Sequence, residues 1–388
     1  MTQTALLGDI CIQITDGTHS TVKDSEDGDY YLLSAKNIKN RIVITSNERR
    51  IDERTLTNLR KRTNTAKGDV LLTSVGTIGE TAIIKEENPG YEFQRSVLIF
   101  KPDTTKVIPE YLYYVLRSKK SHFISMATGA VQKCLFIGPV KNELIQLPDL
   151  EMQKKIAAIL GTLDEKIELN RKMNETLEQM GQALFRHNFI NNPEAEKWEV
   201  GTVSDLVAIY SGYAFKRTDF TPDGKYGLVT IKNVQDGNFL TECSDHLAAV
   251  PAKVQKHIHL KTGDVLLSLT GNVGRVCITY GENLLLNQRV AKLSGAHGRH
   301  SYAYFMFRQN EFKEKLISMS RGTAQLNLSP IETKKVKIKL PPASLLQKFY
   351  NEAEPLFETI TENYQQIQTL ITLRDTLLPR LISGKVKV

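Results

Sequence analysis

The stretch from Leu147 to Phe185 constrains the fold most, because it is predicted to form one long helix. Two rows of residues recur along it every seven positions: Leu163, Asn170, Leu177 and Leu184 in the first row, and Ile159, Lys166, Met173 and Met180 in the second. Heptad spacing of this kind is typical of a coiled-coil seam, here with one Asn and one Lys in it. Asp149 is the predicted N-cap of the helix. A seam needs a partner helix, so the rest of the chain must supply one.

The chain repeats this helix between Leu340 and Leu381. The two predicted rows of the second helix are Phe349, Leu356, Asn363, Leu370 and Leu377, and Ala353, Ile360, Ile367, Arg374 and Leu381. Ser344 followed by Gln347 predicts a capping box at its start. Pro355 lacks an amide proton, so we expect it to kink the helix or to restart it.

The two helices align at an offset of 193 residues, which matches Asn170 with Asn363. Each asparagine lies close to the centre of its helix, so antiparallel packing is expected to bring the two together or nearly together. A buried Asn costs stability but disfavours registers in which it faces an apolar residue. We therefore expect Asn170 and Asn363 to fix the register of the helix pair.

The segments that precede the two helices are also copies of each other. Matching blocks follow in the same order, at offsets that drift only from 196 to 191: Lys36-Asn37-Ile38 with Lys232-Asn233-Val234, GDVLLTSVGTIG (68–79) with GDVLLSLTGNVG (263–274), Gln94-Arg95-Ser96-Val97 with Asn287-Gln288-Arg289-Val290 (the Gln-Arg pair of the second block being Gln288-Arg289), YLYYVLRS (111–118) with YAYFMFRQ (302–309), and Gly129 and Gln132 with Gly322 and Gln325. A constant order at a nearly constant offset indicates an internal duplication. A period near 193 residues is far too long for a solenoid repeat.

This organisation predicts a mixed α+β (α/β) fold built as two similar halves. Each half combines short β-type runs and Gly, Asn and Asp turns with a helix, expected from Pro109 to about Met126 in the first half. The predicted parts are a first domain at residues 1–148, a first helical region at 149–192, a second domain at 193–341 and a second helical region at 342–388. We expect the two helices to form an antiparallel coiled coil with pseudo-two-fold symmetry.

Composition narrows the class of protein. No apolar run is long enough to span a membrane, and the N-terminus lacks the basic-then-apolar pattern of a signal peptide, so the chain is expected to be cytoplasmic. Four scattered cysteines suggest neither a disulfide framework nor a zinc site. A net charge of +8 favours a polyanionic partner, although only modestly.

Catalytic motifs were sought and none was found. The sequence has no GxxxxGK[ST] phosphate-binding loop, no Asn-Pro-Pro-aromatic motif of amino-methyltransferases, and no carboxylates spaced with a Lys as in a nuclease. His257 and His259 alternate as in a strand but lack a third metal ligand. The glycines of SVGTIG and LTGNVG are best interpreted as turn residues. We therefore expect no catalytic residue, no metal and no cofactor.

Binding to DNA is better supported. Seven basic residues lie between Arg49 and Lys67, and they form either a solvated charge run or a surface that follows phosphates. Arg and Lys pair with guanine O6 and N7, while Asn and Gln pair with adenine N6 and N7. For any single residue, a structural role in satisfying buried strands is an equally open alternative. The candidate DNA-binding residues are Lys36, Asn37, Arg60, Arg62, Thr77, Gln94, Arg95, Gln132, Lys133, Lys232, Asn233, Asn272, Gln288, Arg289, Gln325 and Asn327.

Over essentially its whole length the chain resembles the specificity subunits of Type I restriction-modification systems. The resemblance rests on the paired GDVLL…G…G blocks, the Gln-Arg pairs, the LP…Q…I…L helices and the C-terminal LLPRLISGKV. It implies two target-recognition domains, each reading one half of a bipartite sequence in double-stranded DNA. It also implies that the helices space these domains and dock modification (methyltransferase) subunits, two in number, while restriction (translocase/nuclease) subunits join through the complex. Methylation and cleavage would then belong to the partners, in agreement with the missing catalytic motifs.

Two other classes remain open at this point. One is a self-contained DNA methyltransferase or nuclease with unrecognised motifs, and the other is an adaptor in which the duplication serves only protein docking. If the helices act as a spacer, about 35 residues at ~1.5 Å each give about 50 Å. That length corresponds to about 15 base pairs of duplex at ~3.4 Å per pair.

Overall fold

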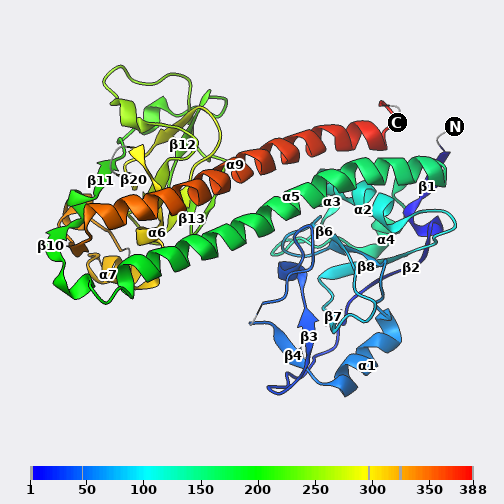
Figure 1. Cartoon of the computed structure of the whole chain (residues 1–388). Coiled ribbons are helices and arrows are strands. Elements are labelled where there is room, and N and C mark those ends of the chain that lie inside the picture. Colours follow the sequence, from blue (N-terminus) through cyan, green and yellow to red (C-terminus); the bar gives the residue numbers. More distant parts are fainter. Residues whose placement is uncertain (1–2, 46, 296–297, 323–325, 387–388) are drawn as a thin grey trace. The chain divides into compact units, whose positions relative to one another are not determined.

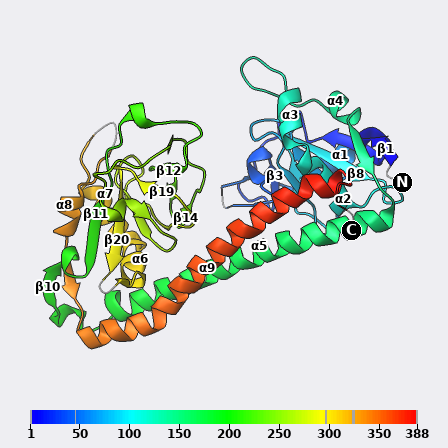
Figure 2. The same cartoon turned by 90° about the horizontal axis from the view of Figure 1, so that it is seen from above.

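The computed structural model describes residues 3–45, 47–295, 298–322 and 326–386. The chain divides into two compact units: unit 1 contains residues 1–165 and 371–388, and unit 2 contains residues 166–370. The two long helices, α5 (Leu150–Phe185) and α9 (Ala343–Ile382), therefore each contribute one segment to each unit. Within each unit, the segments of α5 and α9 lie side by side (Figures 1 and 2).

Unit 1 has the mixed α+β fold that the sequence predicts. Its strands are β1 (Gln3–Leu6), β2 (Cys11–Asp16), β3 (Tyr30–Leu33), β4 (Arg49–Ile51), β5 (Val70–Thr73), β6 (Thr81–Ile83), β7 (Tyr91–Phe93), β8 (Val97–Pro102) and β9 (Leu144–Leu147). Its shorter helices are α1 (Glu53–Thr63), α2 (Pro109–Ser118), α3 (Lys120–Met126) and α4 (Ile137–Lys141). The strands are ordered β2-β8-β5-β6 and β4-β3-β7, with a separate ribbon β1-β9. The single helix expected from Pro109 to about Met126 is thus two helices, α2 and α3.

The sheet β2-β8-β5-β6 is buried on both faces, which explains why β5 is apolar at consecutive positions. Val70 and Leu72 belong to a core with α2, α5 and the end of α9, whereas Leu71 belongs to a second core with β3 and β7. Neighbouring side chains of a strand point to opposite faces, so a strand between two cores cannot alternate with polar residues. Leu378 and Leu381 of α9 contribute to the first core.

Unit 2 repeats this architecture and confirms the predicted duplication. Its strands are β10 (Glu199–Thr202), β11 (Val207–Ser211), β12 (Tyr226–Val229), β13 (Val234–Gln235), β14 (Asn238–Phe239), β15 (His246–Leu247), β16 (His259–Leu260), β17 (Val265–Ser268), β18 (Val276–Ile278), β19 (Leu284–Leu286), β20 (Val290–Gly295) and β21 (Lys337–Leu340). Its shorter helices are α6 (Ser301–Phe307), α7 (Asn310–Ser318) and α8 (Pro330–Lys334). The order β11-β20-β17-β18 matches β2-β8-β5-β6, and the ribbon β10-β21 matches β1-β9. The sheet β15-β12-β19-β16 and the ribbon β13-β14 complete the unit.

The ends of the long helices test three expectations. Asp149 caps α5, since its Oδ1 accepts a hydrogen bond from Met152 N at 2.8 Å. The capping box expected at Ser344 is wrong, because α9 begins at Ala343 and already includes this serine. Pro355 does not restart α9, which continues through it as one helix. This proline is exposed, so the group that loses its hydrogen bond can turn to solvent.

The heptad rows were predicted correctly for α9 but only in part for α5. Every residue of both α9 rows is buried or half-buried. The first α5 row is also buried or half-buried, but Ile159, Lys166, Met173 and Met180 of the second row are exposed. The buried second row is Leu160, Ile167, Asn174 and Gly181, one residue further along. Because Asn174 and Gly181 are not apolar, the heptad pattern of apolar residues does not predict this row.

Asn170 and Asn363 are both buried in unit 2, but they do not bond to each other. Asn363 Nδ2 donates to Asn174 Oδ1 at 2.8 Å, and Asn170 Nδ2 donates to Gln366 Oε1 at 3.1 Å. Asn174 in turn donates to the carbonyl of Ile360 at 3.2 Å. Asn170 and Asn363 are therefore about one helical turn out of register. Asn170 bonds to Gln366 and Asn363 bonds to Asn174.

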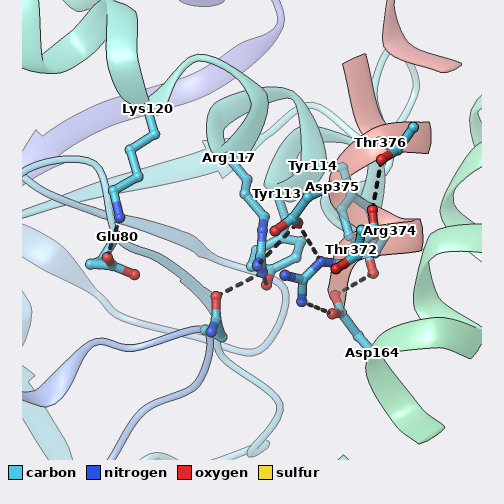
Figure 3. A network of polar contacts seen from close by, with 11 residues as sticks. Glu80, Tyr113, Tyr114, Arg117, Lys120, Asp164, Thr372, Arg374, Asp375 and Thr376 are labelled. Atoms are coloured by element: carbon cyan, nitrogen blue, oxygen red, sulfur yellow. Dashed lines mark hydrogen bonds and ion pairs between the residues drawn. The ribbon is translucent and has the colours of Figure 1, made fainter. Parts of the chain in front are cut away.

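In unit 1, a polar network joins the end of α9 to α2 and α5 (Figure 3). Arg374, with a side chain only 5% exposed, donates to Asp164 Oδ1 at 2.7 Å and to Asp375 Oδ1 at 2.8 Å. The hydroxyl of Tyr114 donates to the other Asp164 oxygen at 2.8 Å. Burial alone would lower the pKa of Arg374, but Asp375 and Asp164 raise it above its ordinary value. The buried guanidinium is thus paired on two sides.

The corresponding joint in unit 2 is apolar. The position of Tyr114 in unit 1 is held by Phe305 in unit 2, and that of Arg374 is held by Gly181. The half-buried Asp164 corresponds to Phe357. A Cβ atom on Gly181 would lie 2.0 Å from Cζ of Phe305, so the glycine makes room for this ring. The ring of Tyr304 meets that of Phe357 edge to face at 5.5 Å between centroids.

Candidate nucleic-acid interface

In unit 1 the candidate residues gather where three loops meet at the end of β5. The backbone of Ser74 connects them: Ser74 N donates to the Ser96 carbonyl at 2.9 Å, and Leu135 N donates to the Ser74 carbonyl at 2.8 Å. The turn that follows Ser74, the loop at residues 94–96 and the loop at residues 128–134 are therefore held together. The turn glycines have positive φ, as predicted: Gly76, Gly79, Gly271 and Gly274.

These loops present several of the predicted side chains to solvent. Thr77, Arg95, Gln132 and Lys133 are exposed, and Gln94 is half-buried. Within the described ranges, the Arg95 side chain makes no hydrogen bond or ion pair. We call this surface, made of the turn at 74–79 and the loops at 94–96 and 128–134, the reading surface of unit 1.

The turn that carries Lys36 lies beside this surface. Thr77 Oγ1 donates to the Ala35 carbonyl at 3.4 Å, which brings the turn at 35–37 against the turn at 74–79. Lys36 is exposed and forms an ion pair with the buried Glu48, with Nζ and Oε2 3.1 Å apart. Lys36 is thus at the surface but already has one partner.

Unit 2 builds the equivalent surface with the same backbone contacts. Leu269 N donates to the Arg289 carbonyl at 3.0 Å, and Leu328 N donates to the Leu269 carbonyl at 2.7 Å. Asn327 forms a bridge with Thr270, so its loop lies against the turn at 269–274. We call the turn at 269–274, the loop at 287–289 and residues 321, 322, 326 and 327 the reading surface of unit 2. Its exposed candidates are Asn272, Gln288, Arg289 and Asn327, and the exposed Lys232 lies beside Asn272. Gln325 lies outside the described residues.

Asn37 and Asn233 are corrected from base-reading residues to structural ones. Asn37 Oδ1 accepts from Ser34 N at 2.9 Å, and its Nδ2 donates to the Val43 carbonyl at 2.8 Å. Asn233 bonds to Thr230 N at 2.9 Å and to the carbonyl of Leu240 at 2.8 Å in the same way. Both asparagines are 2% exposed, so neither amide can reach a base edge. They cap the short turns that carry Lys36 and Lys232.

The Gln-Arg pairs are not equivalent in the two units. Gln94 forms a parallel bridge with Thr18 in unit 1, and Asn287 forms the matching bridge with Tyr213 in unit 2. Counting from these bridges, Arg95 corresponds to Gln288, not to Arg289. This is the register of the matched blocks Gln94-Arg95-Ser96-Val97 and Asn287-Gln288-Arg289-Val290, so only the interpretation of the two Gln-Arg pairs as counterparts is wrong by one residue. Because of this shift, the two reading surfaces present different side chains at the same backbone position.

The basic stretch from Arg49 to Lys67 forms β4, α1 and the loop after it, and much of its charge is neutralised within unit 1. Arg62 is paired with Asp16, and Arg60 donates to the Pro89 carbonyl and lies 3.8 Å from the buried Glu92. These contacts give the two arginines structural partners. Arg62 remains half exposed and close to the reading surface, because its partner Asp16 ends β2 two residues before Thr18, which forms the bridge with Gln94.

One residue at the reading surface of unit 2 was not among the candidates. Arg275 follows the turn at 269–274 and, with Ile231, Lys232, Gln235 and Asn272, lines a hollow of about 220 Å³. Its counterpart in unit 1 is Glu80, which pairs with Lys120 at 2.5 Å (Figure 3). A charge reversal within the matched GDVLL blocks was visible in the sequence and marks this position as variable between the two units.

Several known proteins that are similar to this chain belong to one family. The model of the Type I restriction modification DNA specificity domain matches the chain twice, at residues 2–179 and 195–370. The Type I restriction enzyme MjaIX specificity subunit of Methanocaldococcus jannaschii is 30% identical, over 95% of this chain and 89% of the relative. The HindI specificity subunit of Haemophilus influenzae is 24% identical, over 82% of this chain and 87% of the relative.

A solved structure supports the fold. The S subunit of a Type I restriction-modification system from M. genitalium superposes with a TM-score of 0.59 at 15% identity, covering 98% of this chain and 96% of that one. Two duplicated α+β units with paired long helices define a two-domain specificity protein. This chain belongs to the family of Type I restriction-modification DNA specificity subunits.

No helix among the described residues is long and apolar enough to cross a membrane. Within the same ranges, no group of three or more His, Cys, Asp or Glu side chains could hold a metal ion.

Proposed function

We propose that this chain is the non-catalytic, sequence-specific DNA-binding subunit of a Type I restriction-modification complex, and that each unit reads one half of a bipartite target. The observation that supports this most is the duplicated reading surface. Both units hold three loops together through equivalent backbone hydrogen bonds at the end of the central strand. A scaffold that is kept while its side chains change suits a protein that must read two different sequences.

The side chains on that scaffold differ in chemistry at equivalent positions. Thr77 of unit 1 corresponds to Asn272 of unit 2, and Arg95 corresponds to Gln288. Arg favours guanine, whereas Gln favours adenine, because these side chains match different donor and acceptor patterns in the major groove. We infer that the two half-sites have different sequences.

We further propose that the long helices space the two reading surfaces and dock two modification subunits, with the restriction subunits joining through the complex in the cytoplasm. Both helices keep exposed apolar residues beside their buried rows, including Ile159, Met173 and Met180 of α5 and Leu373 of α9. Exposed apolar residues on a helix offer contact area to a partner protein.

Domain exchange tests the reading function. Residues 1–148 are replaced by the same domain of a relative, and methylated positions are mapped in DNA from cells that carry the complete complex. One half-site should change and the other should stay the same, with the reverse result when residues 193–341 are exchanged. A change of both half-sites in either variant would contradict independent reading.

The rival functions make different predictions for the purified chain. A self-contained methyltransferase would transfer labelled methyl groups to DNA without partners, whereas we expect no transfer until modification subunits are added. A docking adaptor would show no salt-dependent binding to DNA. We expect binding whose affinity falls with salt, since phosphate contacts release counterions.

A further inference from the structure

The hollow on the reading surface of unit 2 has a fixed cation in its wall. Its volume of about 220 Å³ is smaller than the ~300–1,000 Å³ of sites for drug-sized ligands. Ile231 contributes to its lining together with four polar residues, Lys232, Gln235, Asn272 and Arg275. A site of this size and polarity suits the edge of a single planar group.

Two amide oxygens hold the guanidinium of Arg275. Its Nη1 donates to Gln235 Oε1 at 2.5 Å. With the Asn272 amide oriented so that its oxygen faces the arginine, that oxygen accepts from Nη1 and Nη2 at 3.2 Å each. The backbone carbonyl of Asn272 accepts a hydrogen bond from Ser268 Oγ at 2.5 Å, which fixes the turn that carries the side-chain amide. Arg275 is therefore positioned before any ligand arrives.

The bonds to Gln235 and Asn272 leave two N–H donors of Arg275 unused, which equals the number of acceptors on the major-groove edge of guanine. A guanidinium has five N–H groups, and the three bonds to Gln235 and Asn272 use three of them. Nε–H and one proton of Nη2 remain. Guanine presents two acceptors, O6 and N7, on its major-groove edge, whereas adenine presents one acceptor and one donor.

We propose that Arg275 recognises a guanine in the half-site read by unit 2, as a specificity-determining residue positioned by Gln235 and Asn272. This inference rests on the proposed function of the chain. Lys232, which also lines the hollow, adds positive charge, which favours the electron-rich guanine edge further.

A purely structural role for Arg275 is less consistent with the duplication. The equivalent position in unit 1 holds Glu80, and the backbone turn around it is the same. The fold therefore does not need an arginine there. An arginine held by two neutral amides, rather than neutralised by a carboxylate, keeps its full charge for a ligand.

The test uses the full chain, assembled with its modification subunits, and duplexes that contain its mapped target. Each guanine of the half-site read by unit 2 is replaced in turn by 7-deazaguanine, which lacks the N7 acceptor. We expect one replacement to weaken binding of the unmodified protein. Arg275→Ala should weaken binding to the natural target by about 5- to 150-fold. The variant should also lose its sensitivity to the 7-deazaguanine at that one position.

Two control variants accompany Arg275→Ala. Arg275→Lys keeps the charge but loses the planar donors bonded to Gln235 and Asn272, so it should keep the fold and the salt dependence while the guanine preference becomes weaker. Arg299→Ala removes a positive charge that is bonded to Gln347, and should leave sequence preference unchanged. Binding that falls equally for all sequences in Arg275→Ala would show a phosphate contact and overturn the proposal, as would an unaltered guanine preference. Failure of the unmodified protein to prefer any sequence would instead refute the proposed function.

Discussion

The joint between each recognition domain and the long helices is built from opposite chemistry in the two units. In unit 1 the buried Arg374 of α9 pairs with Asp164 of α5. In unit 2 the position that corresponds to Arg374 is Gly181, and the ring of Phe305 occupies the space that a side chain there would need. The surrounding sheet order is the same in both units. Equivalent positions in a duplicated fold can therefore be stabilised by a charge pair or by an aromatic ring, provided that both partners change together.

This difference also teaches that the two halves of each long helix are not interchangeable. The segment of α9 that carries Arg374 fits a domain that offers Asp164 and Tyr114, but it would bring an unpaired charge into the apolar joint of unit 2. Burying an unpaired charge costs several kcal/mol. The sequence of each helix segment is thus matched to one recognition domain.

Removal of the buried cation should give the largest effect on stability. Arg374→Leu leaves the Asp164 carboxylate without its cation in a site where its side chain is 25% exposed. We expect unit 1 to lose about 3 kcal/mol, the lower end of the range for breaking a buried pair, because the carboxylate keeps some contact with solvent. Hydrogen exchange and denaturant unfolding measure the loss.

The double variant Arg374→Leu with Asp164→Leu is the control for this prediction. It should recover most of the lost stability, since an apolar pair can replace a buried ion pair at little cost. It would also make unit 1 resemble unit 2. If the double variant were less stable than the single one, the polar joint would be specifically required, and the two joints would not be alternatives.

A methyl group at Gly181 should give the next largest effect, and in unit 2. Gly181→Ala gains about 1 kcal/mol of helix propensity, but its Cβ overlaps the Phe305 ring. Overpacking of this kind costs about 1–3 kcal/mol, so we expect a net loss. Gly161→Ala is the matched control in the same helix, because nothing lies within 4 Å of its added Cβ. That control should raise the free energy of unfolding, and a similar rise in Gly181→Ala would show that the ring moves freely.

The sequence predicted the duplicated architecture, because the duplication leaves matched motifs that need no knowledge of packing. The second row of α5 was missed because Asn174 and Gly181 are not apolar. The repeat itself contained the correction: subtracting 193 from the correctly predicted α9 residues Ile367 and Arg374 gives 174 and 181. Burial followed the position in the duplicated fold, not the hydrophobicity of the residue.

The candidate site was harder to predict, since polar residues serve both DNA and the fold. Asn37 and Asn233 each follow a Ser or Thr by three positions, at Ser34 and Thr230, which is the spacing of a cap. That pattern could have separated them from base-reading residues. The one-residue shift of the Gln-Arg pairs was present in the sequence, because the matched blocks Gln94-Arg95-Ser96-Val97 and Asn287-Gln288-Arg289-Val290 already align Arg95 with Gln288. The bridge at Asn287 confirms this register.

Loss of one exposed arginine should change DNA binding without changing stability. Arg95→Ala and Arg289→Ala are each expected to weaken specific binding by about 1–3 kcal/mol if they contact a guanine. A phosphate contact would instead lower affinity for all sequences and make the salt slope shallower by about 1. Each substitution should affect a different half-site, because the residues belong to different units. Titrations with half-site variants measure this, and unfolding of either variant would contradict the assignment.

Lys348→Ala is the matched control for these two substitutions. Lys348 is an exposed cation on α9, outside both reading surfaces. The control should reproduce the small effect of losing one positive charge but none of the sequence preference. An effect on half-site preference as large as that of Arg95→Ala would mean that charge alone, and not the reading surface, determines binding.

The smallest effect is expected at the centre of the helix pair, and it separates two buried asparagines. Asn170 is fully buried with one bond to Gln366, and within the described residues its Oδ1 has no partner. Asn170→Leu should therefore leave stability unchanged or raise it by up to about 1 kcal/mol, since it removes an incompletely paired polar group. Asn174→Leu should instead destabilise the pair, because Asn363 would lose its acceptor.

Asn170 and Asn174 are also expected to affect the register of the helix pair through different bonds, Asn170 through Gln366 and Asn174 through Asn363. A leucine at Asn170 fits several registers of two apolar rows, whereas the amide favours the one in which Gln366 is within reach. Cysteine pairs placed one heptad apart along α5 and α9 would report this, since wrong-register disulfides should form more readily in Asn170→Leu than in the unmodified chain. If Asn170→Leu kept a single register and Asn174→Leu did not, register would be fixed by the bond between Asn174 and Asn363 alone.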